Sequence, residues 1–216
     1  MIKNILRIII SKSLFWKIRH LIQPNWIKDY DNAEKNISFI TNFVKENNLK
    51  SVLDFGCASG STLRKLKRLN ISNLVYGVDI NKKAAEYCHS SFKSEFKTGF
   101  FFSTKLKKDE ISKFLNQHNI LKFDIVIFDR VLYCLDDEQI FEILDLIGNS
   151  SYIFIDDFYK NDQTKNYGYA HRDWSNILNR FSFEIHMNIE TIYSKVENAN
   201  ARTMIFKKKV DYLASV

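Results

Sequence analysis

Two closely spaced glycines in the segment SVLDFGCASGSTLRKL, residues 51–66, stand where this sequence is best suited to hold a ligand. The chain has six glycines in 216 residues, and Gly56 and Gly60 follow an apolar run that contains Asp54. Glycine carries no Cβ, so a backbone that contains it can approach a ligand closely. The segment therefore predicts a ligand-binding turn between a strand and a basic helix.

The spacing of this turn differs from two common nucleotide-binding motifs. A Walker A phosphate loop has lysine directly after its last glycine, whereas Ser61 follows Gly60 here. A dinucleotide-binding fingerprint reads G-x-G-x-x-G, and Cys57 and Ala58 interrupt that pattern. The spacing that is present, D-x-G-x-x-x-G, therefore excludes both of these motifs.

Two aspartates indicate the chemistry of the ligand. Asp79 ends the apolar segment LVYGVD and stands 19 residues after Gly60. An acidic side chain at the end of a second strand can accept hydrogen bonds from both hydroxyls of a ribose. Asp54 would be a costly isolated charge at the end of a sheet, and a cationic ligand would compensate it. The two carboxylates therefore favour a ligand with a ribose and a positive charge.

The elements that must position these residues alternate along the chain. Strands are expected at residues 51–55, 74–79, 98–102, 124–128 and 152–155, and helices at 62–69, 82–91, 110–118 and 137–147. Apolar strands that alternate with helices predict a parallel sheet covered on both faces. After a helix at 174–180, residues 183–192 and 203–209 would pair as an antiparallel edge. We therefore expect an α/β fold with a doubly wound, mostly parallel, seven-stranded sheet.

The first part of the chain differs in composition from the rest. Six of the 32 lysines and arginines fall within residues 1–28, before the first acidic residue, Asp29. Residues 2–22 are apolar and periodic, which predicts a helix that ends before the only proline, Pro24, and a second helix is expected at 32–47. We therefore expect a basic, amphipathic N-terminal helical arm over residues 1–30 and a single domain over residues 31–216.

The cysteines and the N-terminal segment bear on the location of the protein. Three cysteines, at positions 57, 88 and 134, are spaced neither as metal ligands nor as a disulfide framework, which fits a reducing compartment. Arg7 and Lys12 interrupt the N-terminal apolar run, which argues against a secretion signal and a membrane-spanning helix. We expect a cytoplasmic protein, with contact of the arm to an anionic membrane surface as an alternative.

The glycine motif, together with Asp79, resembles the first motif of class I S-adenosylmethionine-dependent methyltransferases, and the order of elements from about residue 51 to 209 is similar to that family. The resemblance implies a Rossmann-like fold, S-adenosylmethionine as methyl donor and S-adenosylhomocysteine as product. The sulfonium and α-ammonium of the donor would compensate the charge of Asp54. The cofactor-binding residues that the resemblance implies are Asp54, Phe55, Gly56, Cys57, Gly60, Thr62, Asp79, Ile80, Ser103, Asp129 and Arg130.

Within this set the resemblance implies separate roles. Asp79 would bind the ribose, and Ile80 would pack on the adenine. The segment FDIVIFDRVLYCLDDEQ is similar to the family's fourth motif, which places Asp129 and Arg130 near the methionine part of the cofactor. This segment has neither a Pro-Pro-Tyr core nor a Pro-Cys pair, which counts against base amines and pyrimidine C5 as methyl acceptors. Where the family often has an acidic residue for the adenine amine, this chain has Ser103 or Thr104.

Methyl transfer to a hydroxyl requires a base, because the hydroxyl proton must leave. His171 is the best single candidate, since the free pKa of histidine lies near neutrality. Asp157 and Tyr133 are further catalytic candidates. Three tyrosines near the loop after the fifth strand would shape a pocket for a ring-shaped acceptor; they are Tyr159, Tyr167 and Tyr169. An ordering role for His171 in this loop is the alternative.

A metal-assisted reaction is a second hypothesis. Asp129, Asp156 and Asp157 would stand at neighbouring strand ends, in partial resemblance to metal-dependent sugar and catechol O-methyltransferases. A divalent cation there would bind the acceptor hydroxyls and lower their pKa. Arg130 would oppose such a cation, so a divalent metal is not favoured.

The expected acceptor is a hydroxyl of a small molecule or of a sugar precursor in glycan biosynthesis. The N-terminal arm leaves three roles open: a lid or homodimer contact, a membrane-surface helix, or a contact to nucleic acid. An RNA methyltransferase that binds through the basic arm is therefore an alternative, although basic residues alone attract nucleic acid without sequence preference. A non-catalytic cofactor-binding subunit is another.

Overall fold

A computed structural model describes residues 34–95, 100–103, 108–159, 171–190 and 201–209. Its helices are α3 (Glu34–Glu46), α4 (Ser61–Arg68), α5 (Lys82–Glu95), α6 (Lys108–Gln117), the 3-10 helix η3 (Leu132–Cys134), α7 (Asp137–Ile147) and α8 (Trp174–Asn179). Its strands are β1 (Ser51–Phe55), β2 (Leu74–Asp79), β3 (Phe100–Ser103), β4 (Ile125–Asp129), β5 (Tyr152–Phe158), β6 (Phe183–Glu190) and β7 (Ala201–Lys208). The expected N-terminal arm, Thr104, Tyr167 and Tyr169 lie outside the described residues.

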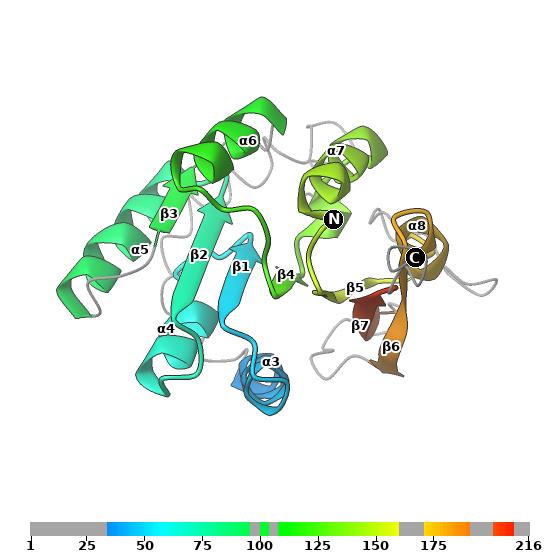
Figure 1. Cartoon of the computed structure of the whole chain (residues 1–216), viewed down its shortest axis with the longest axis horizontal. Helices are drawn as coiled ribbons and strands as arrows, with labels where there is room; N and C mark the ends of the chain where they lie inside the picture. Colours follow the sequence, from blue (N-terminus) through cyan, green and yellow to red (C-terminus); the bar gives the residue numbers. More distant parts are fainter. Residues whose placement is uncertain (1–33, 96–99, 104–107, 160–170, 191–200, 210–216) are drawn as a thin grey trace, which may run out of the picture.

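The strands form one sheet in the order β3-β2-β1-β4-β5-β7-β6 (Figure 1). The pairs from β3 to β5 are parallel, whereas β7 runs antiparallel to both β5 and β6. The α/β sheet, its mostly parallel character and its antiparallel C-terminal pair are thus confirmed. The chain order reverses between β1 and β4, and ligands of open α/β sheets bind beyond the carboxyl ends of the strands at such a point.

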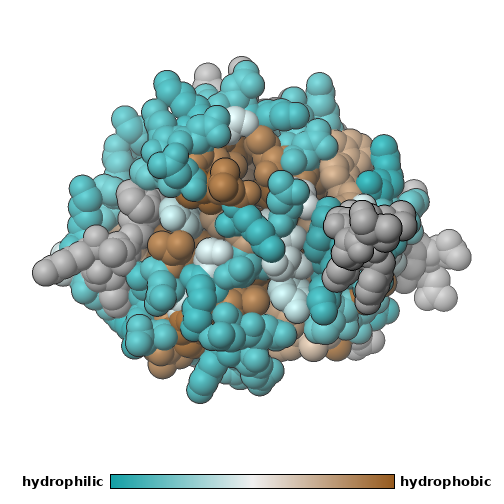
Figure 2. Space-filling view, viewed as in Figure 1, coloured by the Kyte–Doolittle hydropathy of each residue, from teal (hydrophilic) through white to brown (hydrophobic). Residues whose placement is uncertain are grey.

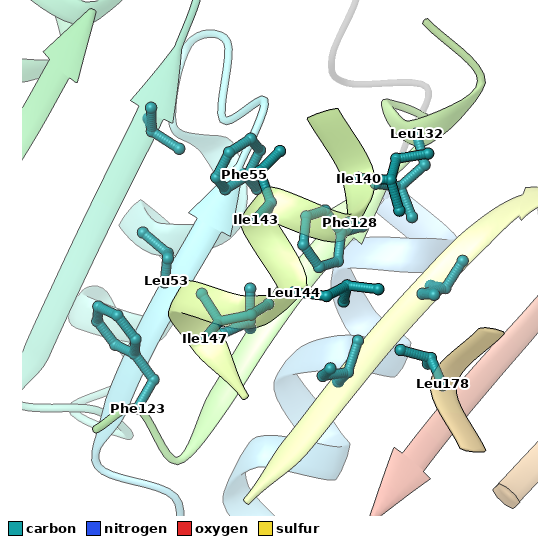
Figure 3. Packing of buried hydrophobic residues seen from close by; sticks show 14 of the residues in the cluster. Leu53, Phe55, Phe123, Phe128, Leu132, Ile140, Ile143, Leu144, Ile147 and Leu178 are labelled. Carbon is teal, nitrogen blue, oxygen red and sulfur yellow. The ribbon is translucent and has the colours of Figure 1, made fainter. Parts of the chain in front are cut away.

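Helices cover both faces of the sheet, and each face has its own apolar cluster. On one face, α6, α7 and α8 pack on alternate strand residues such as Leu53, Phe128 and Ile155 (Figures 1 and 3). On the other face, α3, α4 and α5 pack on Val52 and Ile127, which point the opposite way. Because both faces of the central strands are buried, their sequences are continuously apolar rather than alternating.

One helix matches the sequence expectation, and one strand extends beyond it. Asp136 forms a capping box with Gln139 and starts α7 at Asp137, where the helix was expected. Strand β5 continues through Phe158, because Asp156 to Phe158 pair with β7, so Asp156 and Asp157 lie inside the strand rather than in a loop. The extension of β5 places two buried carboxylates, Asp156 and Asp157, at the carboxyl edge of the sheet.

Hydrophilic residues cover most of the face in Figure 2, and hydrophobic residues appear between them in separate patches. The exposed large hydrophobic residues of the described chain are Leu69, Leu74, Tyr87, Leu121 and Ile185. Among the described helices, none is both long and apolar enough to cross a bilayer.

Candidate active site

The loop after β1 has an unusual backbone that requires its small residues. Gly56, Ala58 and Gly60 all have left-handed φ angles, of 84°, 45° and 75°. The amide of Gly56 donates to the Val78 carbonyl at 2.7 Å, which fixes the loop against β2. A Cβ on Gly56 would lie 2.8 Å from Cγ2 of Val131, so glycine is needed there for space as well as for φ.

Asp79 connects this loop to the end of β2. Its Oδ2 accepts the Ala58 amide at 2.9 Å and its Oδ1 accepts the Asn81 amide at 2.7 Å. A carboxylate oxygen has more than one acceptor site, so these bonds leave capacity for ribose hydroxyls. The structure therefore brings the glycine turn and Asp79 together, as the sequence analysis expected.

Asp54 is a buried carboxylate at the end of β1, and its side chain accepts no hydrogen bond from the residues that the structure describes. Burial raises the pKa of Asp54 well above its ordinary value, and the nearby charges of Asp129 and Asp79 raise it further. A cation at this position would favour the ionised carboxylate and offset the cost of its burial.

Asp129 ends β4 and contacts a residue that the sequence analysis missed. Asn36, on α3, is 1% exposed and donates from Nδ2 to Oδ1 of Asp129 at 3.0 Å. Burial and the charge of Asp156 raise the pKa of Asp129 to about 7, while Arg130 and the Asn36 hydrogen bond act to lower it. Asn36 falls four residues before Ile40 on the apolar stripe of its helix. A polar residue on that stripe is the sequence feature that could have indicated a functional role for Asn36.

Arg130 follows with a left-handed φ of 57° and forms an ion pair with Asp156 through Nε. Asp156 also accepts a hydrogen bond from the hydroxyl of Thr203, and its backbone carbonyl accepts the Arg130 amide. Asp157 has both carboxylate oxygens occupied by backbone amides, those of Phe158 at 2.7 Å and Tyr133 at 3.0 Å.

The metal hypothesis does not fit this arrangement. Within the described ranges, no group of three or more histidine, cysteine, aspartate or glutamate side chains is arranged to hold a metal ion. Of the three proposed ligands, Asp156 pairs with Arg130, and Asp157 accepts two amides. The Arg130 guanidinium already pairs with Asp156, so Asp129, Asp156 and Asp157 do not form a set of metal ligands.

The three catalytic candidates lie in one cluster around Phe158 at the carboxyl end of β5. The ring of Tyr133 meets that of Phe158 edge-on, with centroids 5.3 Å apart, and the ring of His171 is 5.2 Å from Phe158 on centroids. Arg130 lies over the Phe158 ring at 5.7 Å. Asp157 joins the cluster through the Tyr133 amide. The cluster thus stands beside the acidic end of β4, where Asp129 pairs in register with Asp156.

The other expected cofactor residues take varied positions. The side chain of Phe55 packs against Phe128 in the core, so only its backbone belongs to the turn. Cys57 and Thr62 are buried, and Ile80 is partly buried against the core. Ser103 ends β3 in register with Asp79.

Comparison with known proteins identifies the fold and the family. A sequence model of the methyltransferase domain matches residues 46–208, while no curated protein sequence gives a significant match. The methyltransferase domain of bacterial-CtHen1-C has a TM-score of 0.64 at 14% identity, over 83% of this chain and 100% of that one.

Two further solved structures share the fold. Magnesium protoporphyrin IX methyltransferase from Synechocystis PCC 6803, with bound S-adenosylmethionine, has a TM-score of 0.61 at 19% identity, over 96% of this chain and 97% of that one. The small RNA methyltransferase HEN1 has a TM-score of 0.57 at 15% identity, over 82% of this chain and 25% of that one. The chain therefore belongs to the methyltransferase-domain family, with a class I, Rossmann-like fold whose cofactor is S-adenosylmethionine.

Proposed function

We propose that this protein transfers a methyl group from S-adenosylmethionine to a hydroxyl of a small molecule, with a sugar precursor as the leading class of acceptor. The observation that carries the proposal is the cluster of His171, Tyr133 and Phe158 beside the acidic ends of β1 and β4. It offers a titratable base and aromatic surfaces at the edge where the donor binds.

The donor site is formed by the glycine turn and the aspartates. Asp79 binds the ribose hydroxyls from the end of β2, and Gly56 and Gly60 let the backbone approach the nucleoside. Asp54 and Asp129 provide negative charge for the cationic end of the donor. When bound, the donor supplies an electrophilic methyl group on a positively charged sulfur.

His171 acts as the base in this proposal. The contact with Phe158 holds its ring at the end of β5, which supports this role. The acceptor oxygen forms a bond to the methyl carbon while the imidazole takes the hydroxyl proton. The bond between that carbon and sulfur breaks, and its electron pair stays on the sulfur. The acceptor gains a methyl ether, and the proton rests on His171. Much of the catalysis then comes from alignment of the acceptor oxygen.

An RNA acceptor is the second candidate. Two observations favour it: the similarity to the small RNA methyltransferase HEN1 and the basic residues within positions 1–28. A methyltransferase that binds RNA through this segment would show a steep dependence of RNA affinity on salt, and deletion of residues 1–28 would abolish it.

The deciding experiment is a transfer assay with isotopically labelled methyl donor against sugars, nucleotide sugars, phenols and RNA. We expect label in a base-stable ether of a small hydroxyl compound. His171→Ala should lower kcat by about 10²–10⁴-fold with little change in donor affinity. His118→Ala is the matched control. His118 follows α6 shortly before β4 begins, so it lies toward the amino ends of the parallel strands, away from the candidate site at their carboxyl ends. Methyl transfer to RNA alone would refute the small-molecule proposal. Equal activity of the His171→Ala and His118→Ala variants would show that His171 is not the base.

A further inference from the structure

The buried amide of Asn36 is an unexplained feature of the site. Its Nδ2 donates to Asp129, but its Oδ1 is buried and accepts no hydrogen bond from the residues that the structure describes. A buried acceptor without a donor is energetically costly, so such an atom beside a binding site marks a position that a bound ligand can satisfy. Asn36 also lies outside residues 46–208, which the methyltransferase-domain model matches.

Two further acceptors lie with it. The carboxylate of Asp54 accepts no hydrogen bond from the described residues, and Oδ2 of Asp129 likewise has no donor among them. Strands β1 and β4 are parallel neighbours, and Asp54 pairs in register with Ile127, two residues before Asp129, so both carboxylates lie at the same end of adjacent strands. The junction of α3, β1 and β4 therefore presents three acceptor groups, two of them acidic, to which the described chain donates one hydrogen bond, that from Asn36.

A protonated amine is the complement of such a group, because it carries three N–H donors and one positive charge. We propose that Asn36 binds the α-ammonium of the donor's amino-acid end: Oδ1 accepts one N–H, while Nδ2 holds the Asp129 carboxylate in place to accept another. Asp54 takes the third contact or lies close enough to neutralise the charge. This inference rests on the proposed function, since it requires the donor to bind at the glycine turn.

The role of α3 in this proposal is to complete a site that the sheet alone leaves open. The stripe of Ile37, Ile40 and Phe43 packs the helix on the sheet, and Asn36 stands one turn before Ile40 at the carboxyl edge. The packing of the helix therefore sets the position of the amide.

The test compares two ligands that differ in the ammonium. S-adenosylhomocysteine keeps the α-ammonium and lacks the sulfonium, whereas 5′-methylthioadenosine lacks the whole amino-acid end. Asn36→Leu keeps the branched shape of the side chain and removes both hydrogen-bonding atoms. Calorimetric titration should show roughly tenfold or greater loss of affinity for S-adenosylhomocysteine, as expected for a hydrogen bond to a charged group. The affinity for 5′-methylthioadenosine should not change.

Thr41→Val is the matched control, because Thr41 is buried on the same helix and bonds only carbonyls of that helix, at Ile37 and Ser38. It should leave both affinities unchanged. Unaltered S-adenosylhomocysteine binding in Asn36→Leu, or equal weakening of both ligands, would overturn the inference. Asn36→Ala repeats the test if the leucine variant does not fold. Failure of the unaltered protein to bind either ligand would instead refute the proposed function.

Discussion

Gly56 is the residue at which conformation and space are most tightly constrained. Alanine there would have to adopt a φ of +84°, and its Cβ would lie 2.8 Å from Cγ2 of Val131. We expect Gly56→Ala to lower the free energy of unfolding by about 1–3 kcal/mol and to weaken binding of the methyl donor. Urea denaturation and titration with S-adenosylhomocysteine measure the two effects.

The double variant Gly56→Ala/Val131→Ala separates the two causes. Removal of the valine methyl groups relieves the clash but not the left-handed φ. The double variant should therefore lose less free energy of unfolding than the sum of the losses in the two single variants. Purely additive effects would show that the contact with Val131 does not matter.

The buried aspartates predict a pH dependence of stability with a definite sign. Burial raises the pKa of Asp129 and of Asp157 from 3.8 to about 7, so between these values the native state holds protons that the unfolded state has released. The unfolded state is then favoured as the pH rises, and stability of the ligand-free protein should fall between about pH 4 and pH 7. Urea unfolding across this range measures it.

Asp129→Asn is the control for that prediction, because it removes one titrating group and keeps the shape of the side chain. The decline should be smaller in this variant, and an identical pH profile would mean that Asp129 does not titrate in this range. A bound cation favours the ionised carboxylates, so stabilisation by S-adenosylmethionine should in turn grow as the pH rises through 7.

Among the elements, Arg172 joins the segment before α8 to the segment between β4 and α7. Its guanidinium donates to the carbonyls of Leu132 at 3.1 Å and Leu135 at 2.7 Å and to Asp137 at 2.7 Å, and it lies over the ring of Trp174. These bonds position η3, and hence Tyr133, beside the end of β5.

We expect Arg172→Met to lower the free energy of unfolding by about 2–4 kcal/mol, because two buried carbonyls lose donors. Asp137→Asn provides the comparison. The side chain of Asp137 is 73% exposed, so its ion pair with Arg172 contributes less than about 1 kcal/mol. Chemical denaturation of the two variants measures the difference, and similar losses in both would show that the carbonyl bonds are not the main contribution.

For the whole molecule, ligand-linked stability is the direct test of the cofactor. A ligand at about 100 times its dissociation constant raises the free energy of unfolding by roughly 2.7 kcal/mol. S-adenosylmethionine and S-adenosylhomocysteine should therefore raise the melting temperature, whereas a nicotinamide dinucleotide and ATP should not. Asp79→Ala should abolish the shift, and a shift that survives in this variant would refute the ribose assignment.

The sequence by itself was sufficient for the class of fold, the expected cofactor and the order of elements. Strand β1 and helix α7 were predicted to the residue, because continuous apolar runs and an Asp-capped helix start are local patterns. The glycine turn and Asp79 were likewise predicted from spacing, since consecutive strands of a doubly wound sheet pair in a regular order.

Only the tertiary structure decided which side chains meet. Asn36 and Asp129 are 93 residues apart, and Arg130 reaches Asp156 across 26 residues, so no local pattern specifies either contact. Pairing with β7 placed Asp156 and Asp157 inside β5, where a salt bridge and backbone amides occupy them. Local propensity determines the elements, but the partners of a buried charge depend on which segments pack around it, and that is a property of the folded chain.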